Sequence, residues 1–153
     1  KIKKNFFNEK KIINFKNIGQ FISHTAPCIE IVGYRQKKYG IKYLGDLCSD
    51  FGANIKFIVG KEKKYKKVSI GKLKTKIENL NNNYSVIGNT NTVFVNPLNS
   101  LKFVLNKLKK DKIHLNRNFY VFTGSTVGIV QIKNKGIYLG KIDKIGTVKT
   151  KII

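Results

Sequence analysis

The sequence contains no tryptophan, no methionine and only two cysteines in 153 residues. Cys28 and Cys48 form no CxxC pair and have no histidine at ligand spacing, which argues against a zinc site. A low cysteine content favours a reducing compartment, so we expect a cytoplasmic protein. No apolar run approaches the ~20 residues that span a bilayer, and residues 1–11 lack the apolar core of a signal peptide. We therefore expect no membrane segment.

Acidic residues are also scarce, with eight against 31 basic ones and a formal charge of +23. Only Arg35 and Arg117 are arginines, so 29 of the basic residues are lysines. Nucleic-acid-binding proteins use arginine heavily for bidentate contacts. A lysine excess that accompanies abundant Asn and Ile instead suggests an AT-rich genome and a solvated surface. We expect weak, salt-sensitive affinity for polyanions and no specific nucleic-acid partner, with a basic nucleic-acid-binding domain as the alternative.

The length predicts one domain, over residues 1–153, with enough apolar content (41%) for a real core. The chain does not begin with methionine and starts within an alternating, strand-like stretch. We expect it to be the C-terminal part of a longer protein, truncated at its N-terminus, although processing would look the same.

Apolar spacing predicts two helices. One covers 14–24, and the stronger one begins at Pro97, which Asn96 caps. Alternating or continuous apolar runs bounded by Gly and Asn predict the strands, at 28–34, 55–59, 68–77, 120–122, 129–132, 137–142 and 147–152. The pattern indicates a mainly β, α+β domain.

One carboxylate, Glu30, lies in the middle of the stretch 27–35, which otherwise has the pattern of a buried strand. Its neighbours Ile29 and Ile31 are apolar and β-branched. Burial of a carboxylate is costly unless it is paired or holds a metal ion. Two interpretations follow from the residues alone: a buried ion pair with Arg35 or a lysine, or a metal ligand.

Three stretches, in this order along the chain, resemble the fumarylacetoacetate hydrolase superfamily: Pro27–Arg35, Asn96–Leu101 and Phe122–Gly128. The branch they resemble most contains the 2-keto-4-pentenoate hydratases and the oxalocrotonate decarboxylases. The resemblance covers the chain from about residue 21 to its end and corresponds to the C-terminal portion of that family's fold. It implies a rolled mixed β-sheet with one or two flanking helices.

The resemblance further implies a divalent cation, Mg²⁺ or Mn²⁺, held by three carboxylates. Such a cation binds a 2-keto acid substrate and stabilises an enolate. Glu30 matches one of these metal ligands. The other two form an acid-x-acid pair whose place falls at the start of this chain or just before it, yet residues 1–7 contain no carboxylate. Either the pair lies upstream of Lys1, or lysine has replaced it and the site is inactive.

The same resemblance implies substrate contacts at Arg35, Asp50, Thr123, Gly124 and Ser125. The Arg35 guanidinium would bind the carboxylate of the substrate, or it would form a surface salt bridge within the protein. The residues after Asp50 depart from the family pattern, so this side chain is alternatively the cap of a turn. The last three residues would offer backbone amides and a hydroxyl to an oxyanion, or form an ordinary β-turn.

The resemblance implies a metal-dependent hydratase that adds water to 2-hydroxypenta-2,4-dienoate in aromatic compound catabolism and forms a 4-hydroxy-2-oxo acid. A 2-oxo-dienedioate decarboxylase and an acylpyruvate hydrolase share the metal core, and a non-catalytic relative that only binds is the remaining alternative. We expect a homo-oligomer, such as a homodimer, and no activity from residues 1–153 alone.

Overall fold

The computed structural model describes residues 1–35, 42–67 and 69–153. Its strands are β1 (His24–Thr25), β2 (Cys28–Val32), β3 (Asn54–Val59), β4 (Lys63–Lys64), β5 (Lys74–Asn79), β6 (Ser85–Asn89), β7 (Gly136–Ile142) and β8 (Gly146–Ile152). Its helices are α1 (Leu44–Ser49) and α2 (Pro97–Lys110), with 3₁₀ turns at η1 (Lys4–Asn8), η2 (Ile18–Phe21), η3 (Phe51–Ala53) and η4 (Thr90–Thr92). None of the helices within the described ranges has the length and apolar character needed to cross a bilayer.

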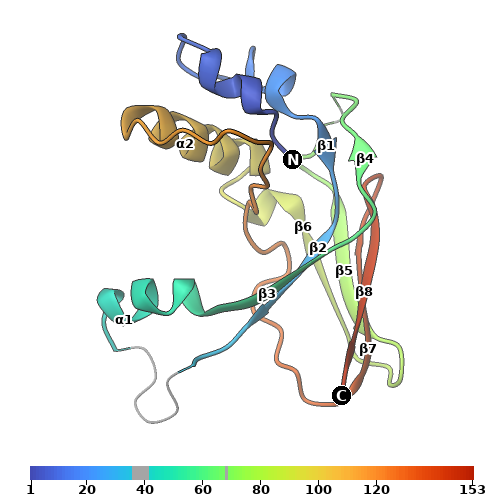
Figure 1. Cartoon of the computed structure of the whole chain (residues 1–153). Helices are drawn as coiled ribbons and strands as arrows, with labels where there is room; N and C mark the ends of the chain where they lie inside the picture. Colours follow the sequence, from blue (N-terminus) through green and yellow to red (C-terminus); the bar gives the residue numbers. More distant parts are fainter. Residues whose placement is uncertain (36–41, 68) are drawn as a thin grey trace.

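The strands divide among three sheets (Figure 1). The largest has the order β6-β5-β7-β8, while β2 pairs with β3 and β1 with β4. All of these pairs are antiparallel. The β2–β3 hairpin extends away from the four-stranded sheet as an arm and carries α1 at its far end (Figure 1). The mainly β, α+β class is therefore confirmed, although the strands form three sheets rather than one rolled mixed sheet.

Helix α2 forms where its local signals predicted it. The Asn96 side chain accepts a hydrogen bond from the amide of Leu98 at 2.9 Å, and Pro97 occupies the first turn. Leu101 and Leu105 face inward and are 5% and 0% exposed. The lysines of the last turn lie at the negative end of the helix dipole.

The main hydrophobic cluster lies between α2 and the N-terminal segment. It comprises Ile2, Phe6, Ile13, Ile18, Phe21, Ile22, Leu101 and Leu105. Ile2 forms β-bridges to Ile22 within this cluster and to Phe119, which packs against it. The four-stranded sheet contributes no residue to the cluster, so its inner face is left to line a cavity.

The helix predicted over 14–24 is wrong, because only the 3₁₀ turn η2 forms there. Side chains compete with the helical hydrogen bonds: Asn14 accepts from the amide of Lys16 at 2.9 Å, and Asn17 accepts from the amide of Asn14 at 2.8 Å. A second helix does exist, but it is α1.

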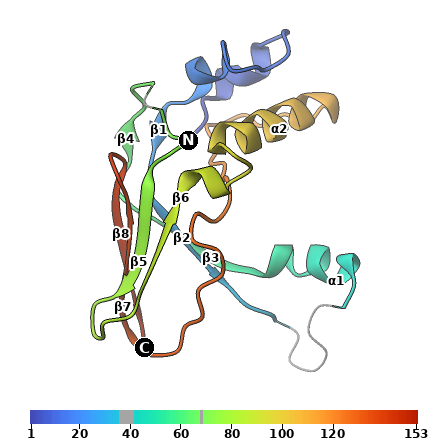
Figure 2. The ribbon, with the colours of Figure 1, turned by 180° about the vertical axis from the view of Figure 1, so that it is seen from behind.

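The strands predicted over 120–122 and 129–132 are also wrong. Within the described ranges, the segment 119–135 forms one β-bridge, between Phe119 and Ile2, and one backbone hydrogen bond to β6, from the Asn89 amide to the Thr126 carbonyl. It runs past β6 toward β7 without a strand partner (Figure 2). Residue 68 of the strand predicted over 68–77 lies outside the described residues, and β5 begins only at Lys74. The predictions that became β2, β3, β7 and β8 are confirmed.

Candidate functional site

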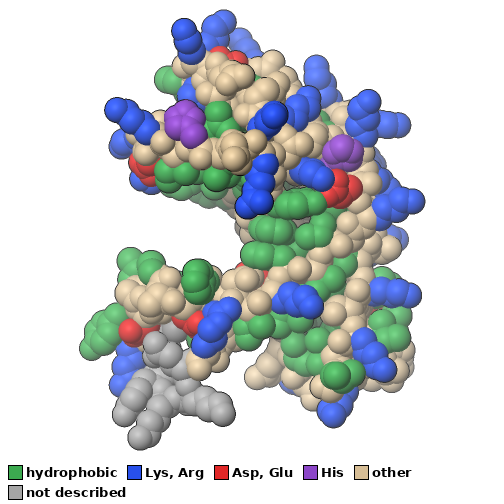
Figure 3. Space-filling view, in the orientation of Figure 1, with side chains coloured by type: hydrophobic (Ala, Val, Ile, Leu, Met, Phe, Trp, Pro, Cys, Tyr) green, Lys and Arg blue, Asp and Glu red, His purple; other side chains and the backbone are tan. Residues whose placement is uncertain are grey.

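A cavity of about 690 Å³ opens on the inner face of the four-stranded sheet. Its walls come from β2, from β5, β7 and β8, and from the segment 120–132. Lysine makes up 29 of the 153 residues but only 3 of the 45 that line the cavity. Figure 3 shows hydrophobic side chains inside the hollow between α2 and α1, with most Lys and Arg side chains on the outer edges. Most of the lysines therefore lie outside the wall of this cavity.

Glu30 lines this cavity from the middle of β2. It is exposed, whereas Ile29 on the opposite face of the strand is 9% exposed. The prediction of a buried carboxylate is wrong, because the β2–β3 arm leaves one strand face open. Its Oε1 accepts a hydrogen bond from Asn54 Nδ2 at 2.8 Å, and it forms no ion pair with any described residue.

Arg35 and Asp50, both predicted to bind substrate, form an ion pair with each other. Arg35 Nη1 lies 2.6 Å from Asp50 Oδ1 and 3.0 Å from the Asp50 carbonyl oxygen, and Nη2 donates to the carbonyl of Asn54. Asp50 is 6% exposed, and its pKa lies below the ordinary value because Arg35 donates to the carboxylate. Neither residue is among those that line the cavity. The pair fixes the base of α1 between β2 and β3.

Thr123, Gly124 and Ser125 line the cavity together with Glu30. The turn is anchored to β6, because the amide of Asn89 donates to the Thr126 carbonyl at 3.1 Å. This close approach requires Gly88, since a Cβ there would lie 2.0 Å from the Thr126 oxygen. In the described part of the chain, the amides of residues 123–126 donate to no acceptor. They are free to donate to an anion.

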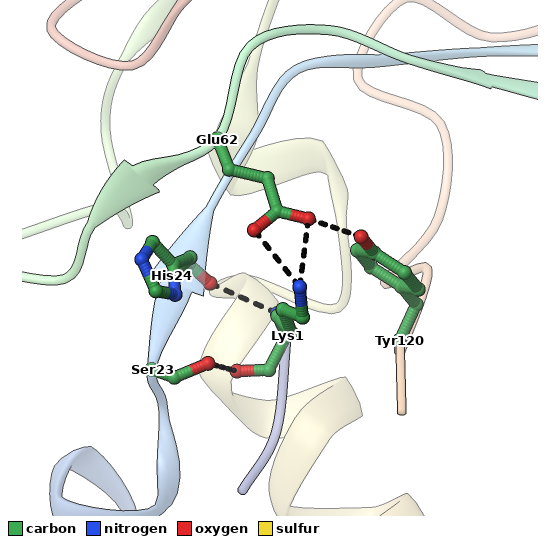
Figure 4. A network of polar contacts seen from close by, with 5 residues as sticks. All are labelled: Lys1, Ser23, His24, Glu62 and Tyr120. Atoms are coloured by element: carbon green, nitrogen blue, oxygen red, sulfur yellow. Dashed lines mark hydrogen bonds and ion pairs between the residues drawn. The ribbon is translucent and has the colours of Figure 1, made fainter. Parts of the chain in front are cut away.

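A cluster of polar side chains around Glu62 also lines the cavity (Figure 4). It was not predicted from the sequence. Both Glu62 carboxylate oxygens lie 3.1 Å from Lys1 Nζ, and Oε1 also accepts a hydrogen bond from the Tyr120 hydroxyl. The bonds from Tyr120 and Lys1 lower the pKa of Glu62, and Glu62 in turn raises the pKa of Tyr120. In the sequence, Glu62 stands among lysines and looks like part of a solvated charged hairpin.

Three aromatic rings connect Glu30 with Glu62. Phe57 is the register partner of Glu30 and stacks on Phe122, with ring centroids 3.7 Å apart. Phe122 in turn stacks on Tyr120 at 6.1 Å. We call these three residues the aromatic wall. It gives the cavity a flat apolar side with one carboxylate near each end.

The cavity offers the type of donor atom that a divalent cation binds, but the described residues offer too few such donors. Carboxylate oxygen is the ligand that Mg²⁺ prefers, and Glu30 offers it at the cavity. Among the described residues, no group of three His, Cys, Asp or Glu side chains is close enough to hold a metal ion. Residues 1–35, 42–67 and 69–153 therefore supply at most part of such a site.

No protein-family model matches the sequence, and no curated protein matches it. Among solved structures, 4-oxalocrotonate decarboxylase from Pseudomonas putida G7, complexed with magnesium and adipate, superposes with a TM-score of 0.76 at 19% identity over 90% of this chain. The chain has the fold of the aligned half of this decarboxylase. A second structure of that enzyme, complexed with calcium and acetate, gives a TM-score of 0.74 at 19% identity, also over 90% of this chain.

The aligned part covers 52% and 51% of the two decarboxylase chains, so this chain spans about half of their length. At this identity the likeness concerns the fold. The resemblance that the three sequence stretches indicated is confirmed at that level.

Proposed function

We propose that this chain forms part of a metal-dependent hydratase that adds water to 2-hydroxypenta-2,4-dienoate or a similar 2-keto acid. One observation carries the proposal: Glu30 and the turn Thr123–Ser125 line the same cavity, in a fold shared with a decarboxylase solved with magnesium and adipate. A carboxylate for a hard cation and free amides for an oxyanion are the two elements that enolate chemistry on a 2-keto acid needs.

In this proposal Glu30 holds the divalent cation, Mg²⁺ or Mn²⁺, and the amide of Asn54 orients the Glu30 carboxylate. When bound, the cation polarises the 2-oxo group. The amides of residues 123–126 bind the substrate carboxylate or enolate oxygen, and the aromatic wall holds the conjugated carbon chain.

The remaining metal ligands are proposed to come from outside residues 1–153. Lys1 and Ile2 line the cavity, so a carboxylate that preceded them would be brought close to it.

Two alternatives each rest on an observation. The names of the two similar structures favour a decarboxylase of a 2-oxo-dienedioate, and an acylpyruvate hydrolase would use the same elements. The incomplete ligand set among the described residues favours a non-catalytic relative that binds without turnover.

The test is product analysis with the intact protein and Mg²⁺ or Mn²⁺, on a dienoate, a dienedioate and an acylpyruvate in parallel. We expect water addition to the dienoate and loss of that activity on removal of the metal by EDTA. Glu30→Gln should abolish it, whereas Glu78→Gln, outside the cavity, should not. Carbon dioxide release from the dienedioate would favour the decarboxylase, and no metal-dependent turnover would favour the binding protein.

A further inference from the structure

Two carboxylates, Glu30 and Glu62, line the cavity within the described ranges. If Glu30 holds the cation, as the proposed function requires, Glu62 is the carboxylate left in this part of the chain to move a proton. His24 also lines the cavity, but its Nδ1 is buried and has no hydrogen-bond partner. The side chain of Glu62 is 27% exposed.

The two carboxylates are at different levels of the cavity. In the β1–β4 ladder, Thr25 pairs with Lys63, the residue that follows Glu62 in the sequence. Glu30 lies five residues after Thr25 along the other side of this pairing. At about 3.3 Å per residue, roughly 15 Å of extended chain separates these levels. The aromatic wall lies between them, with Phe57 beside Glu30 and the Tyr120 hydroxyl bonded to Glu62. A conjugated acid with its oxygen end at Glu30 and its carbon chain along the aromatic wall would extend part of the way toward Glu62.

The Glu62 carboxylate has room for one more hydrogen bond. A carboxylate offers about four acceptor positions. Tyr120 uses one, and Lys1 Nζ uses one on each oxygen, so a position on Oε2 remains. A water molecule can occupy this position by donating one of its hydrogens to Glu62 Oε2. The Tyr120 hydroxyl oxygen, which donates its proton to Glu62, can accept a hydrogen bond from the same water.

We propose that Glu62 is the catalytic base that activates the water added to the far end of the substrate, an inference that rests on the proposed function. Water adds to C4 of the 2-oxopent-3-enoate tautomer. One O–H bond of the water breaks and its proton passes to Glu62, while the C4–O bond forms and the π electrons move to the 2-oxo oxygen. Glu62 then returns its proton to C3, and a 4-hydroxy-2-oxo acid results.

This assignment discriminates between the candidate reactions. Water addition needs a base beside the carbon that accepts the oxygen, which lies away from the end held at Glu30. Decarboxylation of a dienedioate consumes no water. A carboxylate at the position of Glu62 would therefore have no water to deprotonate in that reaction. A base at the far end of the aromatic wall would therefore serve hydration and not decarboxylation.

The test compares Glu62→Gln with Glu78→Gln in the intact protein. Glu78 is a matched control because it also pairs with a lysine, Lys76, and its side chain is also 27% exposed, but it does not line the cavity. We expect Glu62→Gln to lower the kcat of hydration about 10²–10⁴-fold with little change in KM. Deuterium exchange from solvent into C5, which reports only tautomerisation, should persist in Glu62→Gln. Loss of exchange together with hydration would overturn the assignment.

Tyr120→Phe provides a second readout that leaves both charges in place. The groups that face Glu62 are Tyr120, Lys1 and His24, and the first two lower its pKa from the ordinary 4.5. Loss of the hydroxyl should raise that pKa, so the acid limb of kcat/KM should move to higher pH. An unmoved limb, or a Glu62→Gln variant as active as the wild type, would overturn the assignment. An intact protein that turns over no substrate would overturn the proposed function, and this inference with it.

Discussion

Replacement of Gly88 by alanine tests how β6 positions the turn at 123–126. A Cβ at this position would lie 2.0 Å from the Thr126 oxygen and 2.9 Å from the Thr126 carbonyl carbon. Real Cβ atoms essentially never come within 3.0 Å of another heavy atom, so the Thr126 backbone must move by about 1 Å. That movement would break the 3.1 Å hydrogen bond between the Asn89 amide and the Thr126 carbonyl.

We expect Gly88→Ala to lower the free energy of unfolding by about 2–4 kcal/mol. Overpacking contributes about 1–3 kcal/mol, and the lost hydrogen bond contributes about 1 kcal/mol. Guanidinium denaturation measures this change, and the amide NMR shifts of residues 123–126 report the displacement. If the proposed function holds, a 1 Å shift of the turn should also lower kcat/KM by about 10²-fold.

Gly45→Ala is the control, because a Cβ at Gly45 meets nothing within 4 Å. This glycine lies in α1, where alanine is the better helix former, so we expect a gain of up to about 1 kcal/mol. If Gly88→Ala unfolds at the same denaturant concentration as the wild type and leaves the amide shifts unchanged, the close approach of β6 to the turn is refuted.

Three further substitutions test other contacts. Asn96→Ala removes the N-cap of α2 and should cost about 1 kcal/mol of stability in chemical denaturation; no loss would contradict the capping role. Asp50 has a lowered pKa because of Arg35, so the pair stabilises the fold above the ordinary pKa of the carboxyl and loses this effect as the pH falls through the lowered value. Arg35→Met should therefore flatten the decline of stability below about pH 4, and an unchanged acid titration would contradict the pairing. Asn54→Ala should weaken metal binding by the intact protein about 10–100-fold, because the amide orients Glu30; calorimetry with Mg²⁺ measures this, and unchanged affinity would exclude the orienting role.

The elements predicted correctly carry their signals within a few residues. Helix α2 has its cap, its first-turn proline and its apolar stripe in one continuous stretch, so local sequence was sufficient. β7 and β8 are joined by a short turn that ends at Gly146, and their pairing is equally local. The segment 119–135 shows the opposite case. Its apolar runs resemble strands, but a strand also needs a partner edge. In the described part of the chain no strand pairs with residues 120–135, and the sequence does not reveal this.

The candidate site could be predicted only in part for the same reason. Glu30 was noticeable as a charge within an apolar run. The turn at 123–125 was noticeable as a glycine turn that follows an aromatic residue. Both line the cavity. Arg35 and Asp50 are 15 residues apart, and no local pattern shows that they bind each other. Glu62 was missed because its lysine neighbours made it look solvated, whereas Tyr120, its partner, is 58 residues away.

The small number of lysines on the cavity wall has a practical consequence for chemical modification. Reagents that acylate primary amines would react mainly on the outer surface, and among the described residues the lysines on the wall are Lys1, Lys76 and Lys141. Most of the positive charge could be removed, or the protein coupled to a resin through its lysines, while the cavity keeps its shape and its carboxylates. Immobilised protein of this kind would separate ligands of the cavity from polyanions attracted to the lysine-rich exterior.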